Sequence, residues 1–244
     1  MPSHNLAILS CAGSGKTSEI VSLAGDTACR SLLITYTRNN TQAIRDKFYQ
    51  KYGHIPPYCD IDTWYSFLLS HFVRPYQRCF RVERIAGIAW IQGQSTQGIP
   101  KSHTGRYYFS THGRIYRDKV SEFGIACNNA TGGRPLARLG KIYSAVYIDE
   151  FQDLAGWDLE IVEALLRSSI RTTIVGDHRQ HTYRTNDSSK YKQYQGENVL
   201  NLIRKWQNEG LCNAQPLDNN RRGCQAICDF ADYVFPYTHR MTSL

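Results

Sequence analysis

Eight consecutive residues near the start of the chain, Ser10–Thr17, combine small side chains with one lysine and, after it, one threonine. They follow a short apolar run and precede a polar, helix-compatible segment. Small residues let the backbone curl so that its N–H groups face phosphate oxygens, and the next helix adds its positive end. We expect Lys16 to contact the β and γ phosphates and the Thr17 hydroxyl to ligate Mg²⁺. The expected nucleotide-binding residues are Ala12, Gly13, Ser14, Gly15, Lys16 and Thr17.

A second group, Asp149–Asp153, contains three acids and a glutamine directly after the apolar run 144–148. In a parallel sheet, the residues that follow strands present ligand-binding side chains at one edge. We expect Asp149 to hold the magnesium through water, and Glu150 to orient or deprotonate the water that attacks the γ phosphate. Two adjacent acids are common in surface turns, so this interpretation depends on the phosphate loop. Together the two groups predict a site that hydrolyses ATP with Mg²⁺.

The elements that must position these groups alternate between strands and helices. Short apolar runs of strand type occur at 6–9, 31–36, 144–148 and 172–175, and Leu159, Val162 and Leu166 recur at helical spacing. This alternation predicts an α/β fold with a parallel sheet and helices on both of its faces. Residues 61–72 look helical, whereas 92–113 contain five glycines and prolines and look like loops.

More than a hundred residues separate the second apolar run from the third, which indicates an insertion. Residues 71–145 hold twelve Arg and Lys against three acids, a net charge of +9, whereas the whole chain carries +8. Such a basic segment fits either a polyanion-binding surface or a solvated basic face. Trp90, Tyr107, Tyr108 and Tyr116 could stack on unpaired bases or pack inside the insertion.

Composition narrows the classes of protein to which this chain can belong. A chain of 244 residues with 41% apolar and 20% charged residues is typical of a globular protein, and no apolar run reaches the roughly 18 residues of a membrane helix. We therefore expect a cytoplasmic protein with no membrane partner. Eight cysteines in a chain of this size favour reduced thiols over a disulfide framework. Neither Cys224 with Cys228 nor His178 with His181 has further ligands nearby, so a metal site there is not expected.

Six short motifs in order resemble superfamily 1 DNA helicases of the UvrD/Rep type. Besides the phosphate loop and Asp149–Asp153, the resemblance rests on Thr35–Arg38 with Ala43–Arg45, on Asp62–Phe67, on Gly176–Tyr183 and on Leu217–Gly223. It implies a RecA-like ATP-binding core over 1–73 and 142–244, with a basic, mostly helical inserted subdomain over 74–141.

The resemblance also implies roles for particular residues. Gln180 senses the γ phosphate, Arg222 takes the place of the γ-phosphate arginine, and both join Lys16 and Glu150 as expected catalytic residues. The residues expected to contact single-stranded or partly duplex DNA are Thr35, Thr37, Arg38, Thr63, Trp64 and Tyr183. By family, translocation would run in the 3′–5′ direction.

Three departures from the family pattern qualify this reading. Only nine residues precede Ser10, which leaves no room for the glutamine motif that reads adenine in relatives. Arg221 stands where relatives have a tyrosine on the adenine, which further weakens the case for adenine selectivity. About twenty residues follow Arg222, so we expect the second motor domain to be missing from this chain.

Two functions are consistent with the motifs. The first is the ATP-hydrolysing motor domain of a helicase, incomplete alone because translocation needs two lobes that close around ATP. The alternative is a nucleotide-sensing regulatory subunit that partners a nuclease in anti-phage defence. It rests on a weaker resemblance of Asp153–Asp158 and Cys228–Ala231 to the helicase-like component of the Gabija system. Co-purification with a nuclease would favour the alternative.

Overall fold

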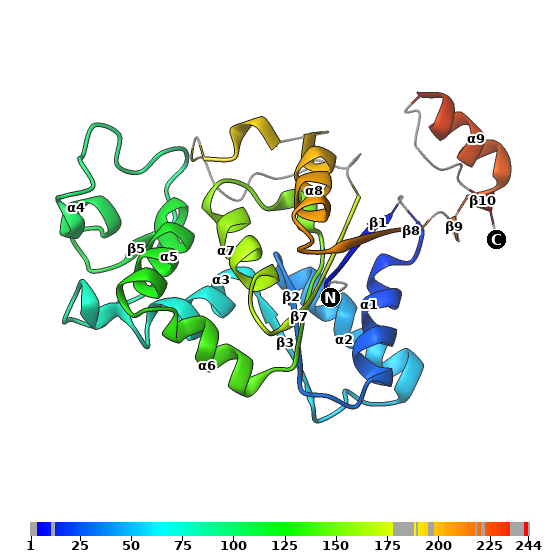
Figure 1. The fold of residues 1–244 in the computed structure, drawn as a ribbon, viewed down its shortest axis with the longest axis horizontal. Coiled ribbons are helices and arrows are strands. Elements are labelled where there is room, and N and C mark those ends of the chain that lie inside the picture. The colour runs from blue at the N-terminus through cyan, green and yellow to red at the C-terminus, as the bar shows by residue number, and fades with distance from the viewer. Residues whose placement is uncertain are drawn as a thin grey trace.

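A computed structural model describes residues 4–10, 13–177, 188, 190–194, 198–217, 219–220, 223–234 and 242–243. Its centre is a six-stranded sheet in the order β3-β2-β6-β7-β1-β8. The strands are β1 (Leu6–Ser10), β2 (Ser31–Thr35), β3 (Cys59–Thr63), β6 (Ala145–Ile148), β7 (Arg171–Gly176) and β8 (Asn213–Leu217). Every neighbouring pair is parallel, so all six carboxyl ends meet at one edge (Figure 1).

Helices cover both faces of this sheet, as the alternating pattern predicted. On one face α1 (Lys16–Asp26) and α2 (Arg38–Tyr52) bury Ile20, Ile44 and Phe48 in a cluster with Leu33 of β2. On the other face lie α3 (Trp64–Phe67), α7 (Trp157–Leu166) and α8 (Val199–Asn208), in a larger cluster with Leu32 and Ile34. Because strand side chains alternate between faces, consecutive residues of β2 fill both cores. The predicted α/β, RecA-like class is confirmed.

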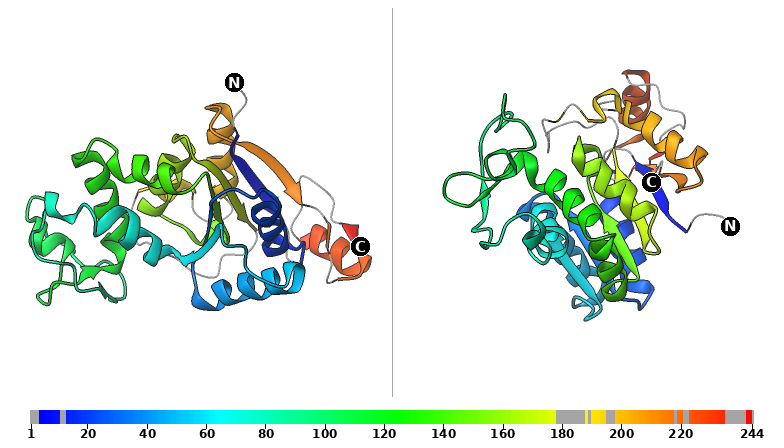
Figure 2. Two further views of the ribbon diagram at one scale, coloured as in Figure 1. Left: turned by 90° about the horizontal axis from the view of Figure 1, so that it is seen from below. Right: turned by 60° about the vertical axis from the view of Figure 1, so that its left-hand side comes forward.

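The predicted insertion contains short elements. They are β4 (Ile88–Ala89), α4 (Thr104–Tyr108), β5 (Ile115–Tyr116), α5 (Val120–Ala130) and α6 (Arg134–Ile142). Figure 2 shows α4 and β5 at the end of the molecule opposite α9 (Gln225–Val234). Helix α5 lies against α7, and the side chain of Phe72 is so close to Gly124 that a Cβ there would meet it at 3.2 Å. The second half of the interval therefore packs on the sheet core, and the boundaries at 73 and 141 stay a prediction.

Two edge strands differ from the sequence-based expectation. The prediction of a helix over 61–72 was wrong at its start, because 61–63 complete β3, and it was correct from Trp64 onward. The five residues of β3 are buried or partly exposed and include two aspartates. They therefore do not show the alternation of apolar and polar residues that is typical of a strand. Strand β8, which contains Pro216, carries no such signal either. Proline is tolerated there because β8 pairs only with β1 within the described sheet.

No helix in the described ranges has the length and apolar character needed to cross a membrane. The seven cysteines that fall in those ranges are free thiols. Two more short strands, β9 (Asn219–Asn220) and β10 (Thr242–Ser243), pair in parallel beside α9.

Candidate functional site

The loop between β1 and α1 has the backbone that a phosphate cradle needs. Gly13 and Gly15 have φ angles of 80° and 86°, in the left-handed region that favours glycine. Gly15 is also the residue that precedes α1, so Lys16 and Thr17 form its first turn. The free N–H groups and the helix dipole at this end attract a negative charge. Ala12 lies outside the described residues.

The loop meets the acids that follow β6, as the two motifs predicted. The Thr17 hydroxyl donates to Asp149 Oδ2 at 3.2 Å, and Lys16 Nζ lies 3.9 Å from Glu150 Oε2. Strand β7 runs between β1 and β6, and the aspartate after it, Asp177, also lies 4.0 Å from Lys16 Nζ. Three strand ends thus contribute to one site. No individual role was expected for Asp177, although its place after an apolar run was a usable signal.

The acidic turn holds charge in an unfavourable environment. Asp149 is 4% exposed, and burial together with the neighbouring Glu150 raises the pKa of its carboxyl to about 7. Glu150 has a φ of 54°, a conformation that costs energy outside glycine and is often found in functional sites. Its backbone N–H donates to Asp149 Oδ1 at 3.0 Å. The turn therefore fixes the directions of both carboxylates.

Magnesium fits these donors. Mg²⁺ prefers oxygen ligands and binds through one or two carboxylates together with substrate phosphates. Thr17 and Asp149 offer a hydroxyl and a carboxylate that already touch. The buried Ser14 hydroxyl has no hydrogen-bond partner among the described residues, so a polar group of a ligand could satisfy it.

Gln152 connects the acidic turn to β7. Its side-chain N–H donates to Glu150 Oε2 at 2.7 Å, and its Oε1 accepts from the backbone N–H of Asp177 at 3.0 Å. A Cβ on Gly176 would lie 2.6 Å from that Oε1, so only glycine leaves room for the glutamine. Ser10, the residue that departs from the usual loop pattern, donates to the Gly176 carbonyl at 3.1 Å. These bonds hold the three strand ends in register with one another.

The predicted DNA-contacting residues divide into two groups. Thr37 and Thr63 cap α2 and α3 by accepting the N–H of Asn40 and Ser66, and the exposed Arg38 opens α2. Thr37 and Arg38 lie just beyond the carboxyl end of β2, and Thr63 is the last residue of β3. Their contacts with DNA stay a prediction.

Thr35 and Trp64, in contrast, are each 1% exposed. The Trp64 indole donates to Asp158 Oδ1 at 2.9 Å and packs in the core. Direct contact of these two side chains with DNA is a prediction that the structure corrects, because buried groups cannot reach a strand outside. Their aromatic and β-branched character serves packing instead.

Four expected residues cannot be compared with the structure. Gln180, Tyr183 and Arg222, like Ala12, lie outside the described residues. Their roles remain those that the motifs imply.

Comparison with known protein families gives one match. The family model described as UvrD/REP helicase N-terminal domain matches residues 134–198, which include the acidic turn, β7 and the Gly176–Tyr183 motif. This segment is similar to UvrD/REP helicases. The resemblance drawn from the motifs is thus confirmed where the family model applies, whereas the Gabija likeness stays a prediction.

Two solved structures of an arterivirus helicase, nonstructural protein 10, also align with the chain. The free protein covers 97% of this chain at 14% identity with a TM-score of 0.45, and its complex with DNA covers 97% at 13% identity with a TM-score of 0.43. The chain spans 41% of each of those proteins. No curated protein matches the sequence.

Within the helicase-type segment, the groups that meet Lys16 and Thr17 come from the two acidic positions after β6 and from the one after β7. The arrangement can neutralise phosphate charge with Lys16, hold a cation on Thr17 and Asp149, and place the Glu150 carboxylate beside the phosphates. These are the parts that phosphoryl transfer to water requires.

Proposed function

We propose that this chain is the Mg·ATP-hydrolysing motor domain of a UvrD-like DNA helicase. The observation that carries the proposal is the convergence of Lys16 and Thr17 with Asp149 and Glu150 at the carboxyl edge of one parallel sheet. Bound magnesium would supply charge neutralisation at the phosphates. Lys16 then binds the β and γ phosphates, and Glu150, oriented by Gln152, accepts the proton of the attacking water.

We also propose that single-stranded DNA crosses the same edge near α2 and the insertion. Trp90 is 66% exposed and stands edge-on to Tyr65, whose ring contacts Tyr36. Tyr36 directly precedes Thr37 and Arg38, the predicted backbone contacts. An exposed indole beside those residues is suited to stacking on an unpaired base. Tyr108, which is 2% exposed, packs in the core instead.

The charges of the insertion support binding of a polyanion. Two of its three acids, Asp118 and Glu122, are buried and lie within 3.9 Å of lysines, and the third, Glu83, pairs with Arg81. Seven exposed cations, in contrast, have no ion pair in the part of the chain that the structure describes: Arg78, Arg84, Arg106, Arg114, Arg134, Arg138 and Lys141. Guanidinium groups without acidic partners are available to phosphates. The division into a core over 1–73 and 142–244 and an insertion over 74–141 belongs to this proposal.

The test is ATP hydrolysis by the full chain, with and without single-stranded DNA. We expect DNA-stimulated hydrolysis in the unaltered protein. Lys16→Ala should weaken nucleotide binding, whereas Glu150→Gln should bind Mg·ATP and hydrolyse it at least about 100-fold more slowly. Nucleotide binding without any hydrolysis in the unaltered protein would contradict the proposal and favour the regulatory subunit, which a search for a co-purifying nuclease then examines.

A further inference from the structure

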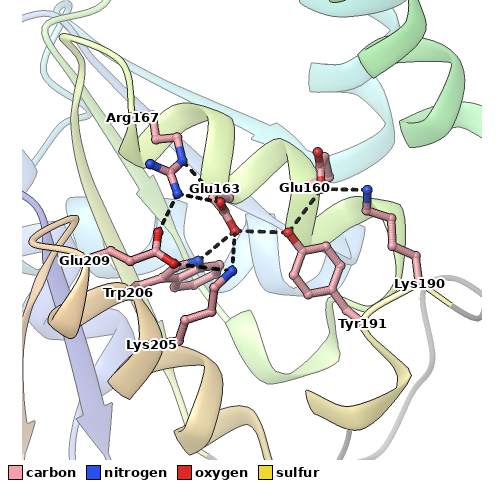
Figure 3. Close-up of polar contacts among 8 residues, drawn as sticks. All are labelled: Glu160, Glu163, Arg167, Lys190, Tyr191, Lys205, Trp206 and Glu209. Carbon is pink, nitrogen blue, oxygen red and sulfur yellow. Dashed lines mark hydrogen bonds and ion pairs between the residues drawn. The ribbon is translucent and has the colours of Figure 1, made fainter.

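A cluster of charged and aromatic side chains outside the ATP site joins α7, α8 and the segment 190–194 (Figure 3). Glu163 of α7 lies at its centre, with a side chain that is 15% exposed. Its Oε2 accepts from Trp206 Nε1 and from the Tyr191 hydroxyl, both at 3.0 Å, and its Oε1 accepts from Arg167 at 2.8 Å. Lys205 Nζ lies 3.5 Å from Oε2. One carboxylate therefore holds three separate elements.

The donors surround this carboxylate more fully than stability alone requires. Removing a charge from water is costly, and an apolar residue of similar volume often stabilises a core as well as an ion pair does. A carboxylate with directed donors instead fixes relative positions, because each hydrogen bond has a preferred length and direction. The arrangement is thus suited to setting where α8 and the segment 190–194 lie against α7.

One neighbour of Glu163 contacts the acidic turn, and another follows the Gly176–Tyr183 motif in the sequence. Trp206 is fully buried and its ring contacts that of Phe151, which follows Glu150 in the acidic turn, at 5.8 Å between centroids. Tyr191, with a left-handed φ of 57°, follows the Gly176–Tyr183 motif by only a few residues. A strained residue keeps such a backbone only when its surroundings hold it. The cluster thus contacts the acidic turn on one side and the segment that follows the motif on the other.

The neighbouring Glu160 reinforces the same segment. The Tyr191 hydroxyl also lies 3.0 Å from Glu160 Oε2, so its single hydrogen is shared between the two carboxylates, and Lys190 Nζ lies 2.9 Å from the same Glu160 oxygen. Lys190 Nζ also lies 4.1 Å from the centroid of the Trp157 ring at the start of α7. Two consecutive residues, Lys190 and Tyr191, are therefore attached to α7 through their side chains, and the segment cannot shift without breaking several contacts.

We propose that Glu163 is a positioning residue that couples DNA binding to ATP hydrolysis, by holding the segment 190–194 and, through Trp206, the acidic turn in a fixed relation. This inference rests on the proposed function. It assigns a role to residues that no motif includes and that touch neither ATP nor DNA. We call the contacts of Glu163 with Trp206, Tyr191, Arg167 and Lys205 the clamp. Loosening the clamp should leave DNA-independent hydrolysis nearly unchanged and reduce the stimulation of hydrolysis by DNA.

Hydrogen exchange of the nucleotide-free full chain tests the clamp without any activity. Tyr191→Phe removes one hydroxyl and keeps the ring, so the fold should persist. We expect amide exchange within 190–194 to quicken about tenfold or more in Tyr191→Phe and in Glu163→Gln, because a hydrogen bond to a charged group is lost or weakened. The matched control is Glu209→Gln, since Glu209 contacts Arg167 and Lys205 of the same cluster but neither Tyr191 nor Trp206.

ATP hydrolysis at saturating ATP, with and without single-stranded DNA, tests the coupling. We expect Tyr191→Phe and Glu163→Gln to lower the ratio of stimulated to basal rate about 2- to 30-fold, the range measured for residues that couple distant sites. Glu209→Gln should keep the ratio of the unaltered protein. Because both substitutions remove or weaken the contact between Tyr191 and Glu163, the double variant should lose less than the two single variants together.

The outcomes separate the two proposals. Suppose that the unaltered protein hydrolyses ATP, and that both variants keep its amide exchange rates and its ratio of stimulated to basal hydrolysis. This result would overturn the role of Glu163 and leave the proposed function standing. A protein that never hydrolyses ATP would contradict the proposed function, and the exchange experiment would still decide whether the clamp exists. An equal loss of basal and stimulated rates would also overturn the coupling role, because it would indicate a general structural effect.

Discussion

At the ATP site, the charge that a side chain needs for its function can conflict with the stability of the fold. Asp149 must be ionised to hold a cation, yet it is buried beside another acid. In the unfolded chain this carboxyl ionises near its ordinary pKa of 3.8, whereas in the fold its pKa is raised to about 7. The folded state thus retains a proton that the unfolded state releases. The unfavourable contribution of this carboxyl to the stability of the fold is absent below about pH 4, grows as the pH rises from about 4 to about 7, and is complete above that range.

Asp149→Asn should therefore stabilise the nucleotide-free protein at pH 8, by on the order of 1–3 kcal/mol, while it removes Mg²⁺-dependent hydrolysis. Thermal unfolding at pH 8 and at pH 5 measures the gain, which should be smaller at the lower pH. A matched control is Asp118→Asn, because Asp118 is also buried but has Lys119 Nζ at 3.9 Å, so its loss should destabilise. Destabilisation by both substitutions at pH 8 would contradict the account of Asp149.

Trp90 illustrates a residue whose exposure, not its type, points to function. Replacement by alanine should weaken binding of single-stranded DNA by about 1–3 kcal/mol, the usual loss for a stacked base, without changing DNA-independent hydrolysis. Fluorescence anisotropy with a labelled oligonucleotide measures the change. Tyr49→Ala removes another exposed aromatic, from the outer side of α2, and should bind as the unaltered protein does. Equal affinities for the two variants would show that Trp90 does not stack.

At the scale of elements, the sequence predicts the buried strands well and the edges poorly. Strands β1, β2, β6 and β7 are nearly continuous apolar runs because both faces of the sheet are covered. Edge strands β3 and β8 are half-exposed and polar, so periodicity does not reveal them. The loop glycines and the adjacent acids could be assigned from their types. Gln152, Asp177 and Glu163 act through contacts between distant elements, which a single sequence does not show.

The fit between β7 and the acidic turn gives an element-scale prediction. Gly176→Ala would place a Cβ 2.6 Å from Gln152 Oε1 and 3.2 Å from the Gln152 backbone nitrogen, so the turn must move. We expect a loss of about 1–3 kcal/mol in stability and a larger proportional loss in hydrolysis, because Glu150 loses its hydrogen bond from Gln152. Gly105→Ala in α4, where nothing lies within 4 Å, is the control. Full activity of Gly176→Ala would show that the glutamine contact is dispensable.

The clamp between α7 and α8 gives a pH-dependent prediction. Partial burial alone would raise the pKa of Glu163, but hydrogen bonds from Trp206, Arg167 and Tyr191, with the charge of Lys205, outweigh it and lower the pKa to about 2. The carboxylate therefore stabilises the fold fully above pH 4.5, and this contribution is lost as the pH falls toward 2.

Glu163→Gln should accordingly unfold at a lower temperature than the unaltered protein at pH 7, with a difference in free energy on the order of 1–3 kcal/mol. The difference should shrink as the pH falls from 4.5 to 2.5. Thermal unfolding of both proteins across this range, monitored by circular dichroism, measures it. A difference that does not change with pH would mean that the charge of Glu163 contributes nothing.

At the scale of the whole molecule, the ATP site and the exposed cations without ion pairs among the described residues occupy different regions. The ATP site uses acids that follow two strands of the sheet core, whereas exposed cations without ion pairs among the described residues are concentrated in the insertion. A polyanion is therefore attracted to one region while the acidic turn binds a cation in another. Salt dependence can therefore report on the phosphate contacts of the insertion, since each neutralised phosphate of a single strand contributes about 0.7 to the slope of log affinity against log salt.

Replacing Arg84, Arg106 and Arg114 with glutamine should make the slope for single-stranded DNA shallower by up to about 2 and weaken binding most at low salt. DNA-independent hydrolysis should not change, because these exposed side chains make no contact with Lys16, Thr17, Asp149 or Glu150 among the described residues. The control replaces Lys47, Lys51 and Arg204, which lie on α2 and α8, and removes the same net charge. If both triple variants lose the same slope, the effect reflects net charge, and the insertion has no special part in DNA binding. A slope changed only by the first variant would locate the phosphate contacts on the insertion, because both variants lose three positive charges.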